Sequence, residues 1–239
     1  MNDKLEGIIL DVRDYKENDV MVKAMISDHG LLTLVAKGAR KMRSKNAMAL
    51  LPHTKSTFYL DYKEGKDIFT LHRAELIRSY YQEDIIKLSA LAIMAKVAYD
   101  SYSQDRYREL YAIIDKCYEA TLDHDILVIL SFYLMKVAEL LGFGAYVDGC
   151  VICDESTVVS FNAEDGGFIC KRHLKDHQLC DIEVLKEIRR IVKTPLSRMD
   201  FLDDMSIDHR TFKLLAEHFY HHTGQDRRPY MFLSQVLRK

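Results

Sequence analysis

Four side chains that can bind a metal ion lie close together in the second half of the sequence. Cys150 and Cys153 are separated by two residues, and Cys170 and His173 repeat this spacing after a further sixteen residues. Thiolate sulfurs and imidazole nitrogens are ligands that Zn2+ prefers, and a C-x2-C pair supplies two of them from one tight turn. The segments VVSFNA and GFIC between the pairs are typical of short strands, and EDGG is typical of a hairpin turn. We therefore expect one zinc ion bound by Cys150, Cys153, Cys170 and His173.

The sequence constrains the fourth ligand less than it constrains the three cysteines. His173 fits the spacing best, but His177 and Cys180 follow closely and offer equivalent ligand atoms. Four protein ligands complete a tetrahedral zinc site and leave no position for a reacting water, so the expected role is structural. The alternative, two unrelated thiol pairs, does not account for the hairpin between them. Cys117 lies in a helical stretch and is expected to be an ordinary buried thiol.

A second possible metal pair lies near the end of the chain. The segment EHFYHH places His218 and His222 four residues apart, on one face of a predicted helix. The segment is not an H-E-x-x-H motif, and the sequence offers no evident third ligand. A half-buried or solvated helix face is the favoured interpretation.

The segment KGARKMRSK, residues 37–45, carries five cations in nine positions. No Asp or Glu occurs between His29 and Leu60, although the whole chain has a formal net charge of -2. An ordinary solvated loop is the alternative, but the lack of interleaved carboxylates favours contact with the phosphates of a nucleic acid, and Gly38 lets the backbone turn. The candidate phosphate contacts are Lys37, Arg40, Lys41, Arg43 and Lys45.

The basic segment lies among predicted β-strands. Five short runs rich in β-branched and aromatic residues occur between residues 5 and 79, and turn signals such as DHG and KEGKD separate them. Such a series predicts a small closed barrel, of which the OB-fold is the common five-stranded form. Barrels of this type often bind single-stranded nucleic acid, and the basic segment falls between the third and fourth predicted strands.

Aromatic side chains near the barrel strands are candidates for stacking on bases. We expect most of them to be core residues, because alternate positions of a strand face opposite sides and only one set can point outward. Phosphate contact is therefore better supported than base contact. The aromatic residues concerned are Tyr15, Phe58, Tyr59, Tyr62 and Phe69.

The pattern changes to a helical period from residue 83 onward. Apolar residues then recur at helical spacing, GFG at residues 142–144 gives a stop signal, and two further helices follow the cysteine-rich segment. We predict an α+β multidomain chain: an OB-fold domain over residues 1–80, and a helical domain over residues 81–239 with a zinc-binding insert at residues 148–176.

Several classes of protein lack their sequence features here. The N-terminal segment is interrupted by charges, and the most apolar stretch, ILVILSFYLM, is about half the length of a membrane span, so we expect a cytoplasmic chain with no membrane partner. No phosphate-binding, dinucleotide-binding or nucleophile-elbow motif occurs, and no carboxylate cluster is evident for a nuclease. A protein that binds its target without catalysis is expected.

The order of several segments resembles the RecO family of bacterial DNA repair proteins. The resemblance rests on RDYKENDVMV, then GLLTLVAKGARK, then LLGF followed by C-x2-C and GGFIC, and it spans nearly the whole chain. Its most specific parts are the KGAR element, the cysteine pair after LLGF, and the pattern R-x-Y-x-E-x-D formed by Arg13, Tyr15, Glu17 and Asp19.

This resemblance implies a recombination mediator that is not an enzyme. Its relatives bind single- and double-stranded DNA, anneal complementary strands, pair with RecR, and help RecA to load onto strands covered by single-strand-binding protein. RecF is a further partner, and a nucleoid-associated location follows from this role. The resemblance adds Arg13 to the DNA-binding candidates, and it matches Cys150, Cys153 and Cys170 to family metal positions. His173 departs from the four-cysteine form of that site.

Two alternatives from other classes remain. A zinc-containing adaptor or transcription regulator would use the barrel to bind protein partners, but no helix with a basic recognition face is evident. A nuclease would need a cluster of carboxylates.

Within the mediator interpretation, the middle of the chain carries 6 basic and 11 acidic side chains over residues 81–149, which suits DNA poorly. We expect it to bind the acidic, apolar-ended tail of single-strand-binding protein, with Arg106 and Arg108 as candidate contacts.

Overall fold

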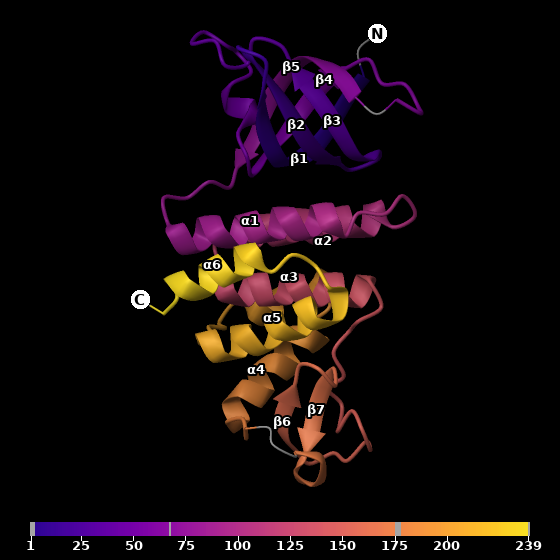
Figure 1. The fold of residues 1–239 in the computed structure, drawn as a ribbon, viewed down its shortest axis with the longest axis vertical. Helices are drawn as coiled ribbons and strands as arrows, with labels where there is room; N and C mark the ends of the chain where they lie inside the picture. The colour runs from indigo at the N-terminus through magenta and orange to yellow at the C-terminus, as the bar shows by residue number, and fades with distance from the viewer. Residues whose placement is uncertain (1–2, 67, 175–177, 239) are drawn as a thin grey trace. The chain divides into compact units, whose positions relative to one another are not determined.

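The computed structural model describes residues 3–66, 68–174 and 178–238 (Figure 1). Strands occupy most of the chain up to Ser79, and helices occupy most of the remainder. The α+β class predicted from the sequence is therefore confirmed.

The described residues divide into two compact units. The first unit runs to Asp84 and also contains residues 91–119. The second unit combines residues 85–90 with the chain from Ala120 onward. The domain boundary expected after residue 80 stays a prediction.

A closed five-stranded barrel forms the first part of the chain (Figure 1). The order around the barrel is β1-β2-β3-β5-β4, and β1 pairs with β4 to close it. Only the β3–β5 pairing is parallel among the pairs of this barrel. The predicted OB-type barrel is thus confirmed. Its strands are β1 (Asp3–Tyr15), β2 (Asp19–Ile26), β3 (Gly30–Ala36), β4 (Thr54–Leu60) and β5 (Ile68–Ser79), and the short helix η1 (Met48–Leu50) precedes β4.

The barrel interior is filled by alternate side chains of its strands. Along β3, Leu32, Leu34 and Ala36 are buried while the residues between them are partly exposed. Phe58 on β4 and Phe69 on β5 are also buried, so two of the aromatic residues considered for stacking are core residues. A strand pleat that is buried on one face requires this alternation.

A buried polar contact lies where β4 begins. His53 has a positive φ of 60°, and its Nδ1 atom lies 3.1 Å from the Tyr118 hydroxyl, which donates to the Leu91 carbonyl at 3.2 Å. The ring of Tyr80 meets the ring of Tyr118 edge-on, with centroids 5.2 Å apart. Burial lowers the pKa of His53 to about 4. The start of β4 and the helices α1 (Ile85–Asp100) and α2 (Tyr107–Ala120) thus share one packed contact.

Helices dominate the second unit. Its central helix α3 (Ile126–Leu140) is almost entirely buried, and the Asp125 carboxylate caps it by accepting from the backbone N–H groups of Leu127 and Val128. The remaining elements are β6 (Val158–Asn162), β7 (Gly167–Cys170), η2 (Lys171–His173), α4 (Ile182–Lys193), η3 (Leu196–Leu202), α5 (His209–Thr223) and α6 (Arg228–Val236). The apolar stretch from residue 126 is therefore a buried helix, as expected. Across the described residues, no helix combines the length and apolar character that crossing a membrane requires.

Candidate metal centre and nucleic-acid interface

The structure brings the four predicted metal ligands together. The ligand atoms of Cys150, Cys153, Cys170 and His173 all lie within 4.8 Å of one another. The Cys153 and Cys170 sulfurs are 3.8 Å apart, and His173 Nδ1 lies 3.4 Å from the Cys170 sulfur and 3.6 Å from that of Cys150. A tetrahedron with Zn–S bonds of about 2.3 Å and a Zn–N bond of about 2.0 Å has S···S edges of about 3.8 Å and S···N edges of about 3.5 Å. The cluster therefore fits one zinc ion.

Local backbone geometry holds the first cysteine pair. Turn hydrogen bonds run from the N–H groups of Cys153 and Asp154 to the Cys150 carbonyl, at 3.2 and 2.8 Å, and the Cys150 N–H donates to the Glu155 carbonyl at 2.8 Å. A Cβ atom added to Gly149 would lie 2.9 Å from the Asp154 carbonyl oxygen, so only glycine allows this close approach. The sequence DGC-x2-CDE therefore folds into a knuckle that points both sulfurs the same way.

The β6–β7 hairpin supplies the other two ligands. Its register pairs Val158 with Cys170, and the Val151 N–H donates to the Phe168 carbonyl at 2.8 Å, which joins the knuckle to the hairpin. His173 follows Cys170 within the single turn of η2. The hairpin predicted from the sequence is present (Figure 1). The ligand atoms of Cys170 and His173 lie within 4.8 Å of those of the first pair.

The surroundings of the cluster favour thiolates. Burial opposes ionisation of the Cys150 thiol, but hydrogen bonds from the backbone of Cys170, Ile152 and Cys153 and from His173 outweigh it and lower the pKa to about 6. A guanidinium nitrogen of Arg172 lies 3.4 Å from the Cys153 sulfur. Three thiolates around Zn2+ carry a net charge of -1, which this guanidinium offsets. The donor set is thus suited to a structural ion with no open coordination position.

Of the alternative fourth ligands, Cys180 lies apart from the cluster. Its sulfur lies 3.7 Å from the Ser160 hydroxyl, and the residues grouped as a possible metal site in the described chain do not include it. His177 lies outside the described residues. Cys117 is buried and forms no disulfide, as expected.

The two histidines on α5, His218 and His222, lie within hydrogen-bonding distance of backbone carbonyls. His218 Nε2 lies 2.9 Å from the Phe143 carbonyl oxygen, and His222 Nε2 lies 2.9 Å from that of Ala163. His218 is buried, and burial lowers its pKa. The pair does not belong to the metal group found among the described residues. Its role in this structure is to fasten two loops to the end of α5.

The basic segment forms a chain of hydrogen-bonded turns between β3 and η1. The Lys41 N–H donates to the Gly38 carbonyl at 3.1 Å, and the Ser44 N–H donates to the Lys41 carbonyl at 2.8 Å. The segment rests on the β1–β2 turn: the Gly38 N–H donates to the Asp19 carboxylate at 2.8 Å, and the Arg40 N–H donates to the Asn18 carbonyl at 3.1 Å. We call residues 37–45 the basic loop.

Two of the predicted DNA contacts are paired with carboxylates. Arg13 lies 2.7 Å from Asp11, and Arg40 lies 2.9 Å from Asp14. The acid-free window from His29 to Leu60 did not indicate the Arg40–Asp14 pair, because Asp14 belongs to β1 and meets Arg40 only in the folded chain. The sequence signal that could have indicated these ion pairs is the group of acidic residues in DVRDYKEND, residues 11–19. Exposed pairs of this kind contribute about 0–1 kcal/mol, so a phosphate can replace either carboxylate.

The other four predicted cations are free for a partner. In the part of the chain that the structure describes, these cations are exposed and no salt bridge joins any of them to a carboxylate. They are Lys37, Lys41, Arg43 and Lys45. Four exposed positive charges on one hydrogen-bonded loop can hold consecutive phosphates of a nucleic acid strand.

The neighbouring β1–β2 turn adds Lys16, a cation outside the predicted set, beside the stacking candidate Tyr15. Tyr15 is 38% exposed, and the Lys16 ammonium lies 5.3 Å from the centroid of its ring. Tyr62, by contrast, stacks on the buried Phe69 ring with centroids 5.3 Å apart. Tyr59 is partly buried and donates its hydroxyl to Glu75 at 2.7 Å, which leaves Tyr15 as the exposed member of the five aromatic residues considered for stacking.

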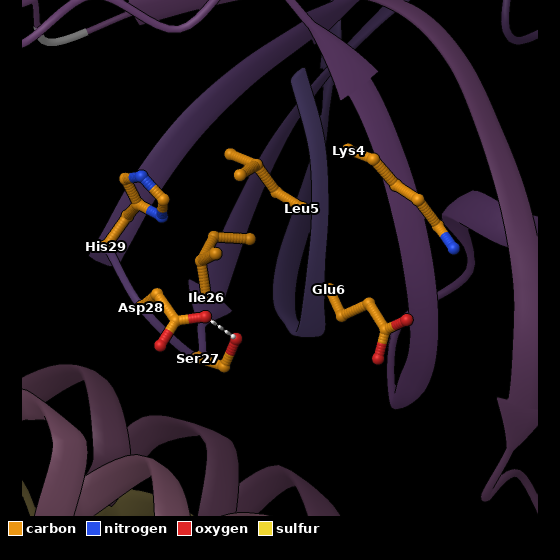
Figure 2. A pocket seen from close by; sticks show the side chains of 7 residues that line it. All are labelled: Lys4, Leu5, Glu6, Ile26, Ser27, Asp28 and His29. Atoms are coloured by element: carbon orange, nitrogen blue, oxygen red, sulfur yellow. Dashed lines mark hydrogen bonds between the residues drawn. The ribbon is translucent and has the colours of Figure 1, made fainter.

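A separate pocket of about 230 Å³ lies against β1 and the β2–β3 turn. Figure 2 shows the side chains that line it, with the Ser27 hydroxyl donating to the Asp28 carboxylate at 3.1 Å. Glu6 and Asp28 contribute carboxylates to this lining, and Lys4 contributes the ammonium. Because its carboxylates outnumber its ammonium groups, the pocket is less suited to phosphate than the basic loop is.

Comparisons with known proteins match the barrel segment and most of the length of the chain. The family model described as "Recombination protein O N terminal" matches residues 1–80. The chain is 30% identical over 182 residues to the DNA repair protein RecO of Bacillus cytotoxicus, and the alignment covers 72% of this chain and 71% of the relative. It is 29% identical over 187 residues to the DNA repair protein RecO of Bacillus cereus strain AH187, and this alignment covers 74% of this chain and 73% of the relative. Since the alignment spans more than two thirds of both proteins, the chain belongs to the RecO family.

Proposed function

We propose that this chain is a DNA repair and recombination mediator that binds single- and double-stranded DNA and anneals complementary strands. The observation that carries the proposal is the basic loop, where Lys37, Lys41, Arg43 and Lys45 are exposed and free of carboxylates within the described residues. Such a loop holds the backbone of any sequence by charge, and a contact of this kind releases readily. Membership of a DNA repair family supports the same conclusion.

We further propose that the chain works with protein partners and not as an enzyme. RecR is the partner expected to act with it in helping RecA to load onto DNA covered by single-strand-binding protein, and RecF is a further partner. The tail of that binding protein is expected to meet the helical part of the chain. Arg106 lies 2.5 Å from Glu109, and the Arg108 guanidinium lies 5.6 Å from the Tyr107 ring centroid, so both are surface groups that an acidic tail can engage. A cytoplasmic, nucleoid-associated location accompanies this role.

Zinc is the metal that we propose for the cysteine-rich cluster. Cys150, Cys153, Cys170 and His173 would hold one ion, and the ion would supply a cross-link between the knuckle and the β6–β7 hairpin. Each of the four residues would contribute one ligand atom, and Arg172 would balance the charge of the thiolates. The barrel and its basic loop lie outside this segment of the sequence.

Annealing of complementary strands tests the proposed function. Two complementary oligonucleotides, one with a donor dye and one with an acceptor dye, report annealing by energy transfer. The protein is expected to accelerate annealing of bare strands and of strands covered by single-strand-binding protein. A variant with Lys37, Lys41, Arg43 and Lys45 changed to Ala is expected to lose most of the acceleration.

A matched control separates local contact from overall charge. Changing Lys186, Arg198, Lys213 and Arg228 to Ala removes the same amount of charge from exposed positions outside the barrel. This control variant is expected to anneal strands like the unchanged protein. Equal loss of annealing in both variants, or no acceleration by the unchanged protein, would contradict the proposal and favour the zinc-containing adaptor or regulator that binds protein partners.

A further inference from the structure

An apolar side chain stands at the most exposed point of the basic loop. Met42 is 101% exposed, which is the largest value among the exposed large hydrophobic residues of the described chain. Single exposed apolar residues are common on protein surfaces and need no explanation by themselves. The position of this one is what calls for an explanation, because its two neighbours in the sequence are the free cations Lys41 and Arg43.

The loop presents Met42 from a defined backbone. The Ser44 N–H donates to the Lys41 carbonyl at 2.8 Å, so Met42 and Arg43 are the two central residues of a turn. Both ends of the loop are anchored: the Gly38 N–H donates to Asp19, and the Asn46 side chain accepts from the Ala74 N–H at 3.0 Å. A turn held at both ends displays its central side chains at little further cost in conformational entropy.

The flanking charges indicate what kind of surface Met42 meets. Two ammonium or guanidinium groups directly beside an apolar side chain disfavour an apolar protein surface, which would leave both charges without partners. A nucleic acid strand offers the matching arrangement, with phosphates for the cations and the apolar faces of bases between them. Methionine is flexible and polarizable, and it is one of the side chains that proteins insert between neighbouring bases.

We infer that Met42 inserts between neighbouring bases of the DNA strand whose phosphates Lys41 and Arg43 hold. This inference rests on the proposed function, and it adds a base contact to a loop whose cations contact only the phosphate backbone. The contact is independent of sequence, because every base has an apolar face. A strand held with two bases separated presents those bases to a complementary strand, which suits annealing.

Fluorescence of 2-aminopurine tests the inference directly, because this base becomes brighter when it leaves a stack. A single strand of mixed sequence with 2-aminopurine at one internal position is titrated with the protein, and affinity is followed by anisotropy over a salt series. The unchanged protein is expected to brighten the probe. Met42→Ala is expected to lose most of the brightening and to bind about tenfold more weakly. The slope of log K against log salt should stay the same, since no phosphate contact is removed.

Two further variants sharpen the result. Met42→Phe retains an apolar group that stacks on bases, so it is expected to keep both the affinity and the brightening. Met48→Ala removes a methionine that is 65% exposed in η1, between two alanines, and it is expected to change neither quantity. Because Met42 is fully exposed, none of these variants removes a core contact.

The outcomes separate this inference from the proposed function. If the unchanged protein binds DNA with a steep salt dependence, and Met42→Ala matches it in affinity and in brightening, the insertion is wrong while DNA binding stands. A flatter salt slope in Met42→Ala would also overturn the insertion, because the side chain would then be shaping the loop. Absence of DNA binding by the unchanged protein would overturn the proposed function itself.

Discussion

At the scale of single residues, charge balance around sulfur is the most informative feature. Arg172 lies 3.4 Å from the Cys153 sulfur, and contact with Cys153 and with the charge of Cys170 raises the pKa of this guanidinium. An outer partner of this kind orients a metal ligand and offsets the negative charge of three thiolates. The neighbouring Lys171 has no such contact with a sulfur among the described residues. The two cations therefore form a natural comparison.

Changing Arg172 to Ala is expected to weaken zinc binding about tenfold or more, because partners of metal ligands typically contribute on that scale. Competition with a coloured zinc chelator measures the change. Lys171→Ala is the control and should bind zinc as tightly as the unchanged protein, and Arg172→Lys should fall between the two. Equal zinc affinity in Arg172→Ala and Lys171→Ala would show that the sulfur contact contributes nothing.

The stability of the barrel unit is expected to depend on the protonation of His53. Burial lowers its pKa to about 4, whereas an unfolded histidine titrates near 6.5. The unfolded state therefore takes up a proton first as the pH falls, and the stabilising contribution present above about 6.5 is lost toward about 4. By pH 5 the free energy of unfolding should fall by about 2 kcal/mol from this group alone.

Urea unfolding at pH 7 and pH 5, followed by circular dichroism, measures this loss. The matched variant is His53→Asn, since asparagine tolerates the positive φ of 60° at this position. The variant should lose less stability between the two pH values than the unchanged protein, by about 2 kcal/mol. The same loss in both proteins would place the pH dependence on other groups.

At the scale of elements, the β6–β7 hairpin is short and depends on its surroundings. It consists of two strands, Val158–Asn162 and Gly167–Cys170, and a lone two-stranded hairpin is only marginally stable in water. The metal ligand Cys170 lies at the end of β7, and at the turn of the hairpin His222 Nε2 lies 2.9 Å from the Ala163 carbonyl oxygen. A bound ion would therefore share with the α5 contact the task of keeping the hairpin folded.

Removal of zinc by a chelator is expected to loosen this hairpin and leave the barrel intact. Hydrogen exchange followed by mass spectrometry should show lost protection in residues 150–173 and unchanged protection in β1 to β5. DNA binding by the chelated protein should stay within about twofold. Loss of barrel protection or of DNA binding on chelation would show that the ion supports more than the hairpin.

The elements differ in how much of them the sequence predicted. The barrel strands and the hairpin were predictable because alternating apolar residues and turn residues specify them locally. The parallel pairing of β3 with β5 was not, because contacts between distant segments leave no local pattern. The same limit applies to the sites. The ligand spacing predicted the metal cluster, whereas the Arg40–Asp14 pair depends on how the basic loop folds onto the β1–β2 turn.

At the scale of the whole molecule, charge is distributed unevenly along a nearly neutral chain. The net charge is -2, yet residues 1–80 carry 14 basic and 11 acidic side chains, and residues 81–149 carry 6 and 11. The positive field is therefore local to the barrel and concentrated in one loop. A charge distribution of this kind is suited to binding a polyanion at one place, as the proposed function requires.

The salt dependence of single-stranded DNA binding tests this account most directly. Anisotropy titrations over a salt series should give a steep slope of log K against log salt for the unchanged protein. Changing Lys37, Lys41, Arg43 and Lys45 to Ala should flatten the slope by about 2.8, at about 0.7 for each lost phosphate contact. The variant at Lys186, Arg198, Lys213 and Arg228 should keep the original slope. Identical slopes for the unchanged protein and the loop variant would contradict the account, because the basic loop would then be ordinary surface.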